Sequence, residues 1–399
     1  MTSEATLPGQ EAAGAAGVAA GGAAGAVHGG ARAERALLLA PSRGLGGGIE
    51  RYLQTVESAF DDAGVASRRV DLCRPGLAGH RALLTEATSA LAGIAGPARP
   101  RLVVGHRSLL PVAAVLARTG LVDGISVVCH GSDVWRSRRT PRGGLESRLM
   151  RRRDVRLVAV SSFTAGALLP HGLATILPPG LSRAWFGELA RAADTVAADT
   201  VAAGREAAGR EAAGASRSGL GVMTAFRLAE WRDKGLPQLT AALAALGRAE
   251  VRLTVCGSGA PPADLVAHVR GYPWCTLCPG LDDAGLAARF AQASLFVLAT
   301  RTRPGRRPSG EGFGLVLLEA QVARTAVVGP AHGGSPGAYL EGITGETPRD
   351  ESVPALARVL DGLLARPARL GQMGYLGARW ARARFDPDRY AALAVERLL

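Results

Sequence analysis

Short apolar runs alternate with helix-like stretches along most of the chain, and this alternation restricts the fold more than any other feature. The first run covers residues 36–40, after which Ile49, Tyr52 and Val56 recur at the spacing of one helix face. Later runs in the first half cover residues 102–104, 125–129, 157–160 and 175–177. Because alternating strands and helices build parallel sheets covered by helices, the pattern predicts an α/β fold with doubly wound sheets.

A repetitive segment interrupts the alternation, which then starts again. Residues 192–216 form near-perfect pentads (AADTV, AADTV, AAGRE, AAGRE, AAGAS), a period that fits neither a helix face nor a strand. Strand-like runs return at residues 221–225, 251–256, 295–299 and 326–328. We interpret the pentads as a linker, helical in patches or disordered. The linker would join two Rossmann-like domains that face each other across a cleft, with ligands at the carboxyl ends of the strands.

The chain is therefore expected to have five segments. The order is a disordered Ala/Gly tail (1–33), an N-terminal acceptor-side Rossmann-like domain (34–187), a low-complexity linker insertion (188–219), a C-terminal nucleotide-sugar-binding Rossmann-like domain (220–380) and a C-terminal helix packing back on the N-terminal domain (381–399). The tail lacks the basic start and compact apolar block of a secretion signal.

Composition bounds the location and the partners. No stretch approaches the ~20 apolar residues of a membrane-spanning helix. Five cysteines, an odd number in a long chain, are typical of a reduced, cytoplasmic protein. The net charge is +13, and the arginines crowd residues 136–156, which predicts contact with phosphate or an anionic membrane surface; a solvated face is the alternative. No aromatic side chains interleave with this run, which argues against nucleic acid.

Two carboxylates flank an expected anion-binding helix start. Glu311 is followed by Gly312, Phe313 and Gly314, and a helix-like run that contains Glu319 begins at Leu315. Glycines let backbone amides approach a ligand closely, and the free N–H groups of a helix start suit a phosphate. Carboxylates accept hydrogen bonds from vicinal hydroxyls, so the segment predicts recognition of a ribose or sugar.

Two cations follow the first strand of the second half. Arg227 stands at the strand end, and Lys234, the only lysine among 47 basic residues, precedes a helix. A compact ammonium and a guanidinium at this edge would hold a diphosphate and stabilise its charge as it leaves. In the first half, His130 and Gly131 follow a strand, and Gly47 and Gly48 follow another, where they could meet the same ligand.

Taken in order, these residues resemble the retaining glycosyltransferases of family 4, which have the GT-B fold. The resemblance rests on the segment 47–52, His130-Gly131, Val160-Ser161, 178–180, Arg227 with Lys234-Gly235, 257–259, the E-x7-E from Glu311 to Glu319, Gly333-Gly334 and 342–345. The segment 311–320 is similar to phosphatidylinositol mannosyltransferases and to actinobacterial-type enzymes that build small glycosylated metabolites.

The resemblance implies roles for single residues. Catalytic positions would be His130, Glu311, Arg227 and Lys234. The donor would lie against Gly47, Gly48, Arg227, Lys234, Gly257, Gly312, Phe313, Gly314, Leu315 and Glu319. The acceptor side would include His106, Asp133, Arg136 and Arg139. No metal site and no cofactor are implied, and a GDP- or UDP-linked sugar would be the co-substrate.

The expected function is metal-independent, retaining transfer of a hexose-type sugar from a nucleotide-diphosphate donor to an acceptor hydroxyl. The acceptor is either a phospholipid or inositol-type molecule or a small metabolite of natural-product biosynthesis. A nucleotide-sugar epimerase of the same fold is the alternative, and a basic nucleic-acid-binding protein is a more distant one. A cytoplasmic enzyme that contacts the inner membrane surface is compatible with either acceptor.

Overall fold

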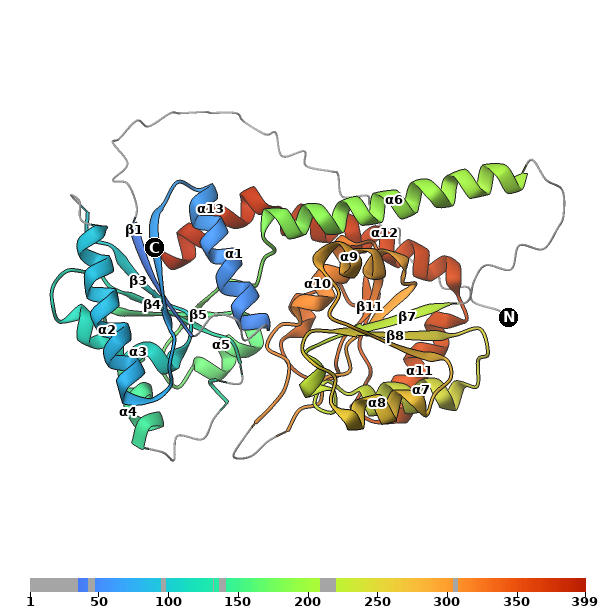
Figure 1. The fold of residues 1–399 in the computed structure, drawn as a ribbon, viewed down its shortest axis with the longest axis horizontal. Coiled ribbons are helices and arrows are strands. Elements are labelled where there is room, and N and C mark those ends of the chain that lie inside the picture. Colours follow the sequence, from blue (N-terminus) through green and yellow to red (C-terminus); the bar gives the residue numbers. More distant parts are fainter. Residues whose placement is uncertain are drawn as a thin grey trace, which may run out of the picture. The chain divides into compact units, whose positions relative to one another are not determined.

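The fold contains two parallel six-stranded sheets with helices on their faces (Figure 1). A computed structural model describes residues 35–41, 47–94, 98–131, 133–135, 141–208, 220–303 and 308–399. The expected tail at 1–33 and the last pentads, in 209–219, lie outside the described residues. The α/β prediction is confirmed. We call the part built on the first sheet the N-terminal lobe and the part built on the second sheet the C-terminal lobe.

The N-terminal lobe has the strand order β2-β1-β3-β4-β5-β6, with every neighbouring pair parallel. Its strands are β1 (Arg35–Pro41), β2 (Ala66–Leu72), β3 (Arg101–Val104), β4 (Ile125–Cys129), β5 (Val155–Ala159) and β6 (Ala174–Ile176). Its helices are α1 (Gly48–Asp62), α2 (Gly76–Gly93), α3 (Leu110–Ala117), α4 (Pro141–Leu149) and α5 (Ser162–Leu168).

The C-terminal lobe repeats this scheme in the order β12-β11-β10-β7-β8-β9. Its strands are β7 (Gly221–Ala225), β8 (Arg252–Gly257), β9 (Cys275–Pro279), β10 (Leu295–Val297), β11 (Ala326–Val328) and β12 (Gly345–Glu346). Its helices are α7 (Leu236–Leu246), α8 (Ala263–Arg270), α9 (Asp283–Gln292), α10 (Leu315–Val322), α11 (Val353–Leu364) and α12 (Pro367–Arg384).

Helix α6 (Arg183–Ala208) enters the pentad segment without a break. Of the two states expected for the pentads, helical in patches or disordered, residues 192–208 therefore adopt the helical one. Two physical reasons explain this. Alanine has the highest intrinsic helix propensity, and the first turns of α6 are anchored because Leu189 and Ala193 are buried.

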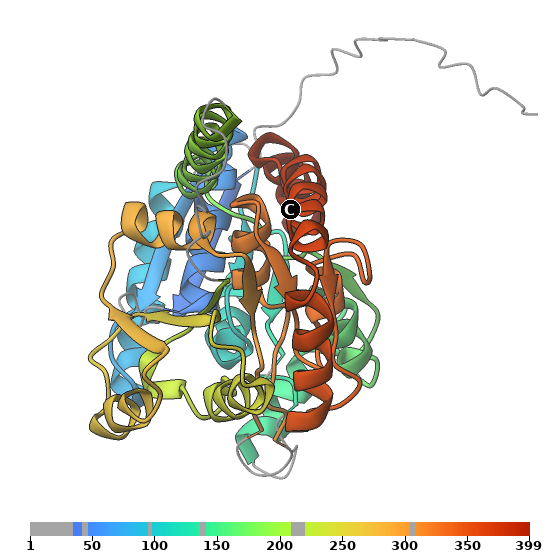
Figure 2. The ribbon, with the colours of Figure 1, turned by 90° about the vertical axis from the view of Figure 1, so that its right-hand side faces the viewer.

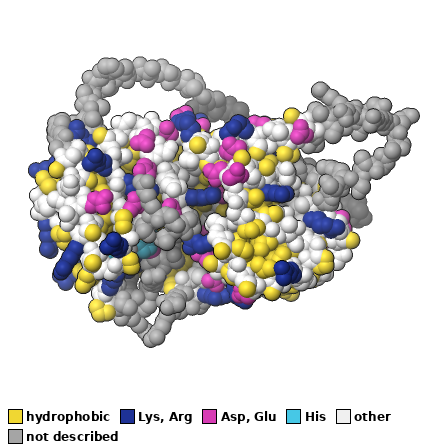
Figure 3. Space-filling model, viewed as in Figure 1, with side chains coloured by type: hydrophobic (Ala, Val, Ile, Leu, Met, Phe, Trp, Pro, Cys, Tyr) yellow, Lys and Arg dark blue, Asp and Glu magenta, His cyan; other side chains and the backbone are white. Residues whose placement is uncertain are grey.

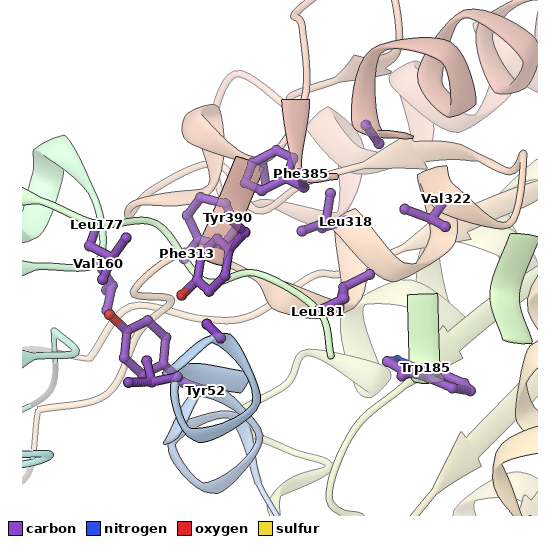
Figure 4. Packing of buried hydrophobic residues seen from close by; sticks show 14 of the residues in the cluster. Tyr52, Val160, Leu177, Leu181, Trp185, Phe313, Leu318, Val322, Phe385 and Tyr390 are labelled. Carbon is purple, nitrogen blue, oxygen red and sulfur yellow. The ribbon is translucent and has the colours of Figure 1, made fainter. Parts of the chain in front are cut away.

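Both sheets bury both faces, as a parallel sheet covered by helices requires. Along β1, Leu38 joins one apolar cluster, whereas Leu37 and Leu39 join the cluster under α2 and α3. The first of these clusters also contains side chains of the C-terminal lobe, including Phe313 and Leu318 (Figure 4). An apolar core thus continues from one lobe to the other.

The last helix, α13 (Pro387–Leu398), crosses back to the N-terminal lobe. It packs along α1, and the Ser126 hydroxyl on β4 donates a 2.7 Å hydrogen bond to the Leu398 carbonyl. Figure 1 shows the red end of the chain leaving the second sheet for the first, and Figure 2 shows the red helices along one side of the molecule. Asp386 caps the helix by accepting hydrogen bonds from the backbone N–H groups of Asp388 and Arg389.

Charged side chains of both signs are interspersed on the face shown in Figure 3. Within the run at 136–156, Arg136 and Arg139 lie outside the described residues, whereas Arg148 and Arg151 are exposed. Leu145 is exposed beside them, whereas Met150 is buried in the core. No helix among the described residues is long and apolar enough to span a lipid bilayer.

The packing of α13 predicts a position-dependent cost of a buried charge. Ala394 is fully buried against the N-terminal lobe, whereas Ala392 on the same helix is exposed. We expect Ala394→Asp to lower the free energy of unfolding by about 3 kcal/mol or more, because it buries a carboxylate without a partner. Ala392→Asp, the matched control, should change it by roughly 0.5 kcal/mol or less. Urea denaturation measures both, and equal effects would contradict the packing.

Candidate functional site

A cavity of about 670 Å³ lies at the carboxyl ends of the second sheet's strands, where both lobes contribute its walls. Parallel sheets place ligand sites at this edge. The predicted donor residues Gly47, Gly48, Arg227, Lys234, Gly257, Glu311, Gly314, Leu315 and Glu319 line it. The fold therefore brings these residues, which are far apart in the sequence, to one cavity.

The two predicted cations each face a carboxylate. Arg227 follows β7 and its Nη1 donates a 2.7 Å hydrogen bond to Glu230 Oε1. The Lys234 Nζ lies 3.1 Å from Glu311 Oε2. Burial lowers the pKa of the Lys234 ammonium, but the charge and hydrogen bond of Glu311 outweigh it, so the pKa lies above its ordinary value. Both groups are positively charged at neutral pH and reach the cavity.

Glu311 is held from two sides in the loop before α10. Its Oε2 accepts hydrogen bonds from the Lys234 ammonium and from the Thr300 hydroxyl, each at 3.1 Å. Thr300 lies in the loop that follows β10. The Glu311 side chain is 13% exposed, so it retains a limited contact with the cavity. These two hydrogen bonds fix Oε2, so Oε1 is the Glu311 oxygen that could contact a ligand.

Glycines bring the backbones of the two lobes close together beside Glu311. A Cβ on Gly312 would stand 1.9 Å from the His130 carbonyl oxygen, and a Cβ on Gly47 would stand 2.0 Å from Arg227 Nη2. Gly314 adopts a φ of 85° at the start of α10, a conformation that favours glycine. The Phe313 side chain packs in the core against Phe385, so only its backbone can serve a ligand.

Glu319 is the most deeply buried carboxylate of the cavity wall. Its side chain is 1% exposed on α10. Its Oε1 accepts a 2.5 Å hydrogen bond from Arg51 Nη1 and a 3.0 Å hydrogen bond from Trp185 Nε1. Its Oε2 has no hydrogen-bond partner among the residues that the structure describes.

His130 lies beside the cavity and is not part of its lining. Its Nε2 is 2.9 Å from the Gly105 carbonyl, which can only accept, so Nε2 carries the proton and Nδ1 is the acceptor of the neutral ring. Burial lowers the pKa of His130, although the Asp133 charge and the hydrogen bond to Gly105 act in the opposite direction. The ring also meets Tyr52 edge to face at 5.2 Å.

The predicted acceptor-side residues have mainly structural contacts. Asp133 Oδ1 accepts from the backbone N–H groups of His130 and Gly131, at 3.0 and 2.8 Å, and so shapes the turn that carries His130. His106 accepts a hydrogen bond from the Ser108 backbone and caps a short helical turn. Neither lines the cavity. The other two, Arg136 and Arg139, lie outside the described residues.

Sequence reasoning did not identify several residues of the site. Arg51 and Trp185 bind Glu319, while Glu230 and Thr300 bind Arg227 and Glu311. Arg51 lies within the quoted segment 47–52, which is the one local signal that could have found it. In the described part of the chain, no group of three or more His, Cys, Asp and Glu side chains is arranged to hold a metal ion.

Comparison with known proteins matches the C-terminal lobe by sequence. Residues 220–366 match the family described as "Glycosyl transferases group 1". A GDP-mannose-dependent alpha-(1-6)-phosphatidylinositol monomannoside mannosyltransferase of Mycobacterium tuberculosis is 33% identical over 117 residues, which are 29% of this chain and 30% of that protein. A D-inositol 3-phosphate glycosyltransferase of Streptomyces coelicolor is 35% identical over 30% of this chain and 24% of its own length. The chain thus spans about three tenths or less of these relatives.

Solved structures resemble the chain over nearly its whole length. Anabaena HepE, in complex with UDP-glucose, covers 91% of this chain and 98% of its own, with a TM-score of 0.65 and 15% identity. Sucrose-phosphate synthase from Thermosynechococcus elongatus covers the same shares, with a TM-score of 0.68 and 18% identity. At these identities the likeness concerns the fold, and it confirms the predicted GT-B arrangement of two Rossmann-like domains.

The environment of His130 predicts how it titrates. Because burial lowers its folded-state pKa below the ordinary 6.5, the neutral ring stabilises the fold above that pH, and this contribution is lost as the pH falls below it. NMR titration of the ring, assigned with a His130→Gln variant, measures the pKa. Asp133→Asn should lower it further, because the Asp133 charge acts to raise it. An ordinary pKa that does not respond to this variant would contradict the assignment.

Proposed function

We propose that the chain, whose residues 220–366 match the glycosyl transferases group 1 family, moves a sugar from a nucleoside diphosphate donor to an acceptor hydroxyl. One observation carries this proposal. Arg227, Lys234 and the buried Glu319 converge on one cavity at the carboxyl ends of the second sheet. Two cations suit a diphosphate, and a carboxylate suits ribose hydroxyls.

The donor would bind mainly to the C-terminal lobe. Arg227 and Lys234 would hold the diphosphate, whose negative charge can share these cations with Glu230 and Glu311. The start of α10, with the amides after Gly314, would meet a phosphate oxygen or the sugar. The relatives' names support a GDP- or UDP-linked sugar: one is GDP-mannose-dependent, and HepE was solved with UDP-glucose.

Transfer would retain the configuration of the sugar and would need no metal. The acceptor oxygen forms its bond to the anomeric carbon on the face from which the diphosphate departs, and its proton passes to a leaving phosphate oxygen. Arg227 and Lys234 would stabilise the charge that develops on that phosphate. Neutral His130, held by the Gly105 carbonyl, would position the transferred sugar from the N-terminal lobe. These roles make the protein a retaining enzyme like those of family 4.

The acceptor would be an inositol-type alcohol, free or attached to a phospholipid. The names of both sequence relatives include an inositol compound. On the N-terminal lobe, Arg148 and Arg151 are exposed and could contact an anionic group of such an acceptor. A small metabolite of natural-product biosynthesis remains the second source of an acceptor hydroxyl. Exposed Leu145 next to these arginines would favour a membrane surface over a soluble acceptor.

Removal of either cation tests the donor site. We expect Arg227→Ala and Lys234→Ala each to lower turnover by about 100-fold or more, because each supplies roughly 3 kcal/mol to the transition state. Activity is measured with GDP- and UDP-sugars, and donor hydrolysis is followed where no acceptor is known. Arg232→Ala is the matched control, since Arg232 pairs with Asp264 and stacks on Trp231 outside the cavity. Near-normal turnover in both cavity variants would contradict the proposal.

Vesicle binding separates the two acceptor sources. A protein that works on a membrane acceptor should sediment with vesicles that contain phosphatidylinositol and should release as the salt concentration rises from about 0.1 to 1 M. Replacement of Arg148 and Arg151 by Glu should abolish sedimentation while donor hydrolysis persists, because both lie away from the cavity. A protein that stays in solution at low salt but glycosylates free inositol phosphate would favour the soluble acceptor.

A further inference from the structure

The ion pair between Arg51 and Glu319 joins the two lobes across the cavity. Arg51 comes from the first turn of α1 in the N-terminal lobe, and Glu319 comes from α10 in the C-terminal lobe. The two residues are 268 positions apart, and their atoms Nη1 and Oε1 lie 2.5 Å apart. Both residues line the cavity. The contact therefore belongs to the cavity wall and to the interface between the lobes.

Trp185, near the start of α6, completes the contact. Its indole N–H donates to the same Glu319 oxygen at 3.0 Å, and the Arg51 guanidinium lies 5.5 Å from the centre of its ring. Trp185 belongs to the buried apolar cluster that also includes Leu181 and Leu318 (Figure 4). The indole is thus fixed by packing, and it directs Oε1 of Glu319 toward Arg51.

The ion pair is asymmetric in burial. The Arg51 side chain is 40% exposed, whereas that of Glu319 is 1% exposed. The Glu319 charge raises the pKa of Arg51 against the lowering effect of burial, so the guanidinium stays charged. Loss of the guanidinium would leave a buried carboxylate without a cation, which is unfavourable. We therefore expect this pair to persist when a ligand enters, unlike the more exposed pair of Arg227 and Glu230.

The two oxygens of Glu319 consequently differ in what they can bind. Oε1 is occupied by Arg51 and Trp185, while Oε2 is buried and has no hydrogen-bond partner within the described part of the chain. A buried carboxylate oxygen gains most from a donor group, because it has lost its contact with water. A hydroxyl of a bound ligand is such a donor.

We propose that Arg51 is a positioning residue of the donor site, which holds Glu319 by Oε1 so that Oε2 receives the ribose hydroxyls of the nucleotide. The inference rests on the proposed function and adds a residue of the N-terminal lobe to it. Recognition of the ribose then depends on a contact between the lobes, because the guanidinium from α1 holds the carboxylate of α10 in its orientation.

The test compares two ligands in each variant. Isothermal titration calorimetry gives the Kd of the nucleoside diphosphate that the wild type binds, GDP or UDP, and of its 2′,3′-dideoxy form. The Kd of the dideoxy form divided by the Kd of the nucleoside diphosphate measures how much the hydroxyl contacts contribute, and a value above 1 means that they favour binding. We expect Arg51→Ala to lower this ratio at least tenfold, which is about the effect of one hydrogen bond to a charged group. Arg51→Lys, which keeps the charge but has no planar fork, should give an intermediate ratio.

Two further variants serve as controls. Arg183→Ala removes an arginine that pairs with Asp62 and Asp388 outside the cavity, and it should leave the ratio unchanged. In a Glu319→Gln background, Arg51→Ala should no longer change the ratio, because the charge that it orients is absent. Thermal denaturation of each variant shows that the protein is folded.

The possible outcomes separate this inference from the proposed function. A reduced ratio in Arg51→Ala, with the control unchanged, supports the inference. If Arg51→Ala weakens both ligands equally, the residue only maintains the structure and the inference is wrong, while the proposed function stands. If the wild type binds neither nucleotide, the proposed function is wrong and the inference fails with it.

Discussion

The site depends on the close approach of two backbone segments from different lobes. Gly312 lies so near the His130 carbonyl that any side chain would collide with it, and Gly334 has the same relation to the Gly312 carbonyl. These glycines allow the loop before α10 to lie directly beside the strand end that carries His130. Glu311 and the start of α10 belong to the same loop, so this contact sets how close they lie to the N-terminal lobe.

The charged side chains of the cavity include three ion pairs, which differ in how far they are exposed to solvent. Arg227 and Glu230 are both more than a third exposed, Lys234 and Glu311 are less so, and Glu319 is almost fully buried. Exposed pairs contribute little to stability and exchange partners readily, whereas a buried carboxylate keeps its cation. The gradient thus separates cations that an incoming anion can recruit from the one cation that orients the site. Each of the three cations that line the cavity thus has a carboxylate partner when no ligand is bound.

Much of the fold could be predicted because each buried parallel strand corresponds to a short apolar run in the sequence. Strand β11 was predicted with its observed bounds, and the run at 36–40 lies within β1. The edge strand β2 was missed because Val70 is its only buried residue, and its charged side chains resemble a loop. The pentads were expected to be helical in patches or disordered, and the length of α6 was not predicted because a five-residue period gives no continuous helix face.

The site was predictable only as far as its residues occur in recognisable order. Arg227, Lys234, Glu311 and Glu319 belong to local motifs, and the structure brings them to one cavity. Arg51 and Trp185 reach Glu319 from two other elements, and no local pattern signals a contact over such a separation. Asp133 was placed on the acceptor side by the family resemblance alone. Its Oδ1 accepts hydrogen bonds from the turn itself, a role that the resemblance did not indicate.

Lys234 has one more consequence, which comes from its being the only lysine of the chain. The 46 other basic residues are arginines, so the cavity contains the only side-chain amine of the molecule. Acylating or reductive alkylating reagents, which ignore guanidinium groups, therefore have one internal target. Its raised pKa and its contact with Glu311 make that amine a slow nucleophile at neutral pH. The rate at which such a reagent modifies Lys234 would therefore measure whether a bound ligand covers this residue.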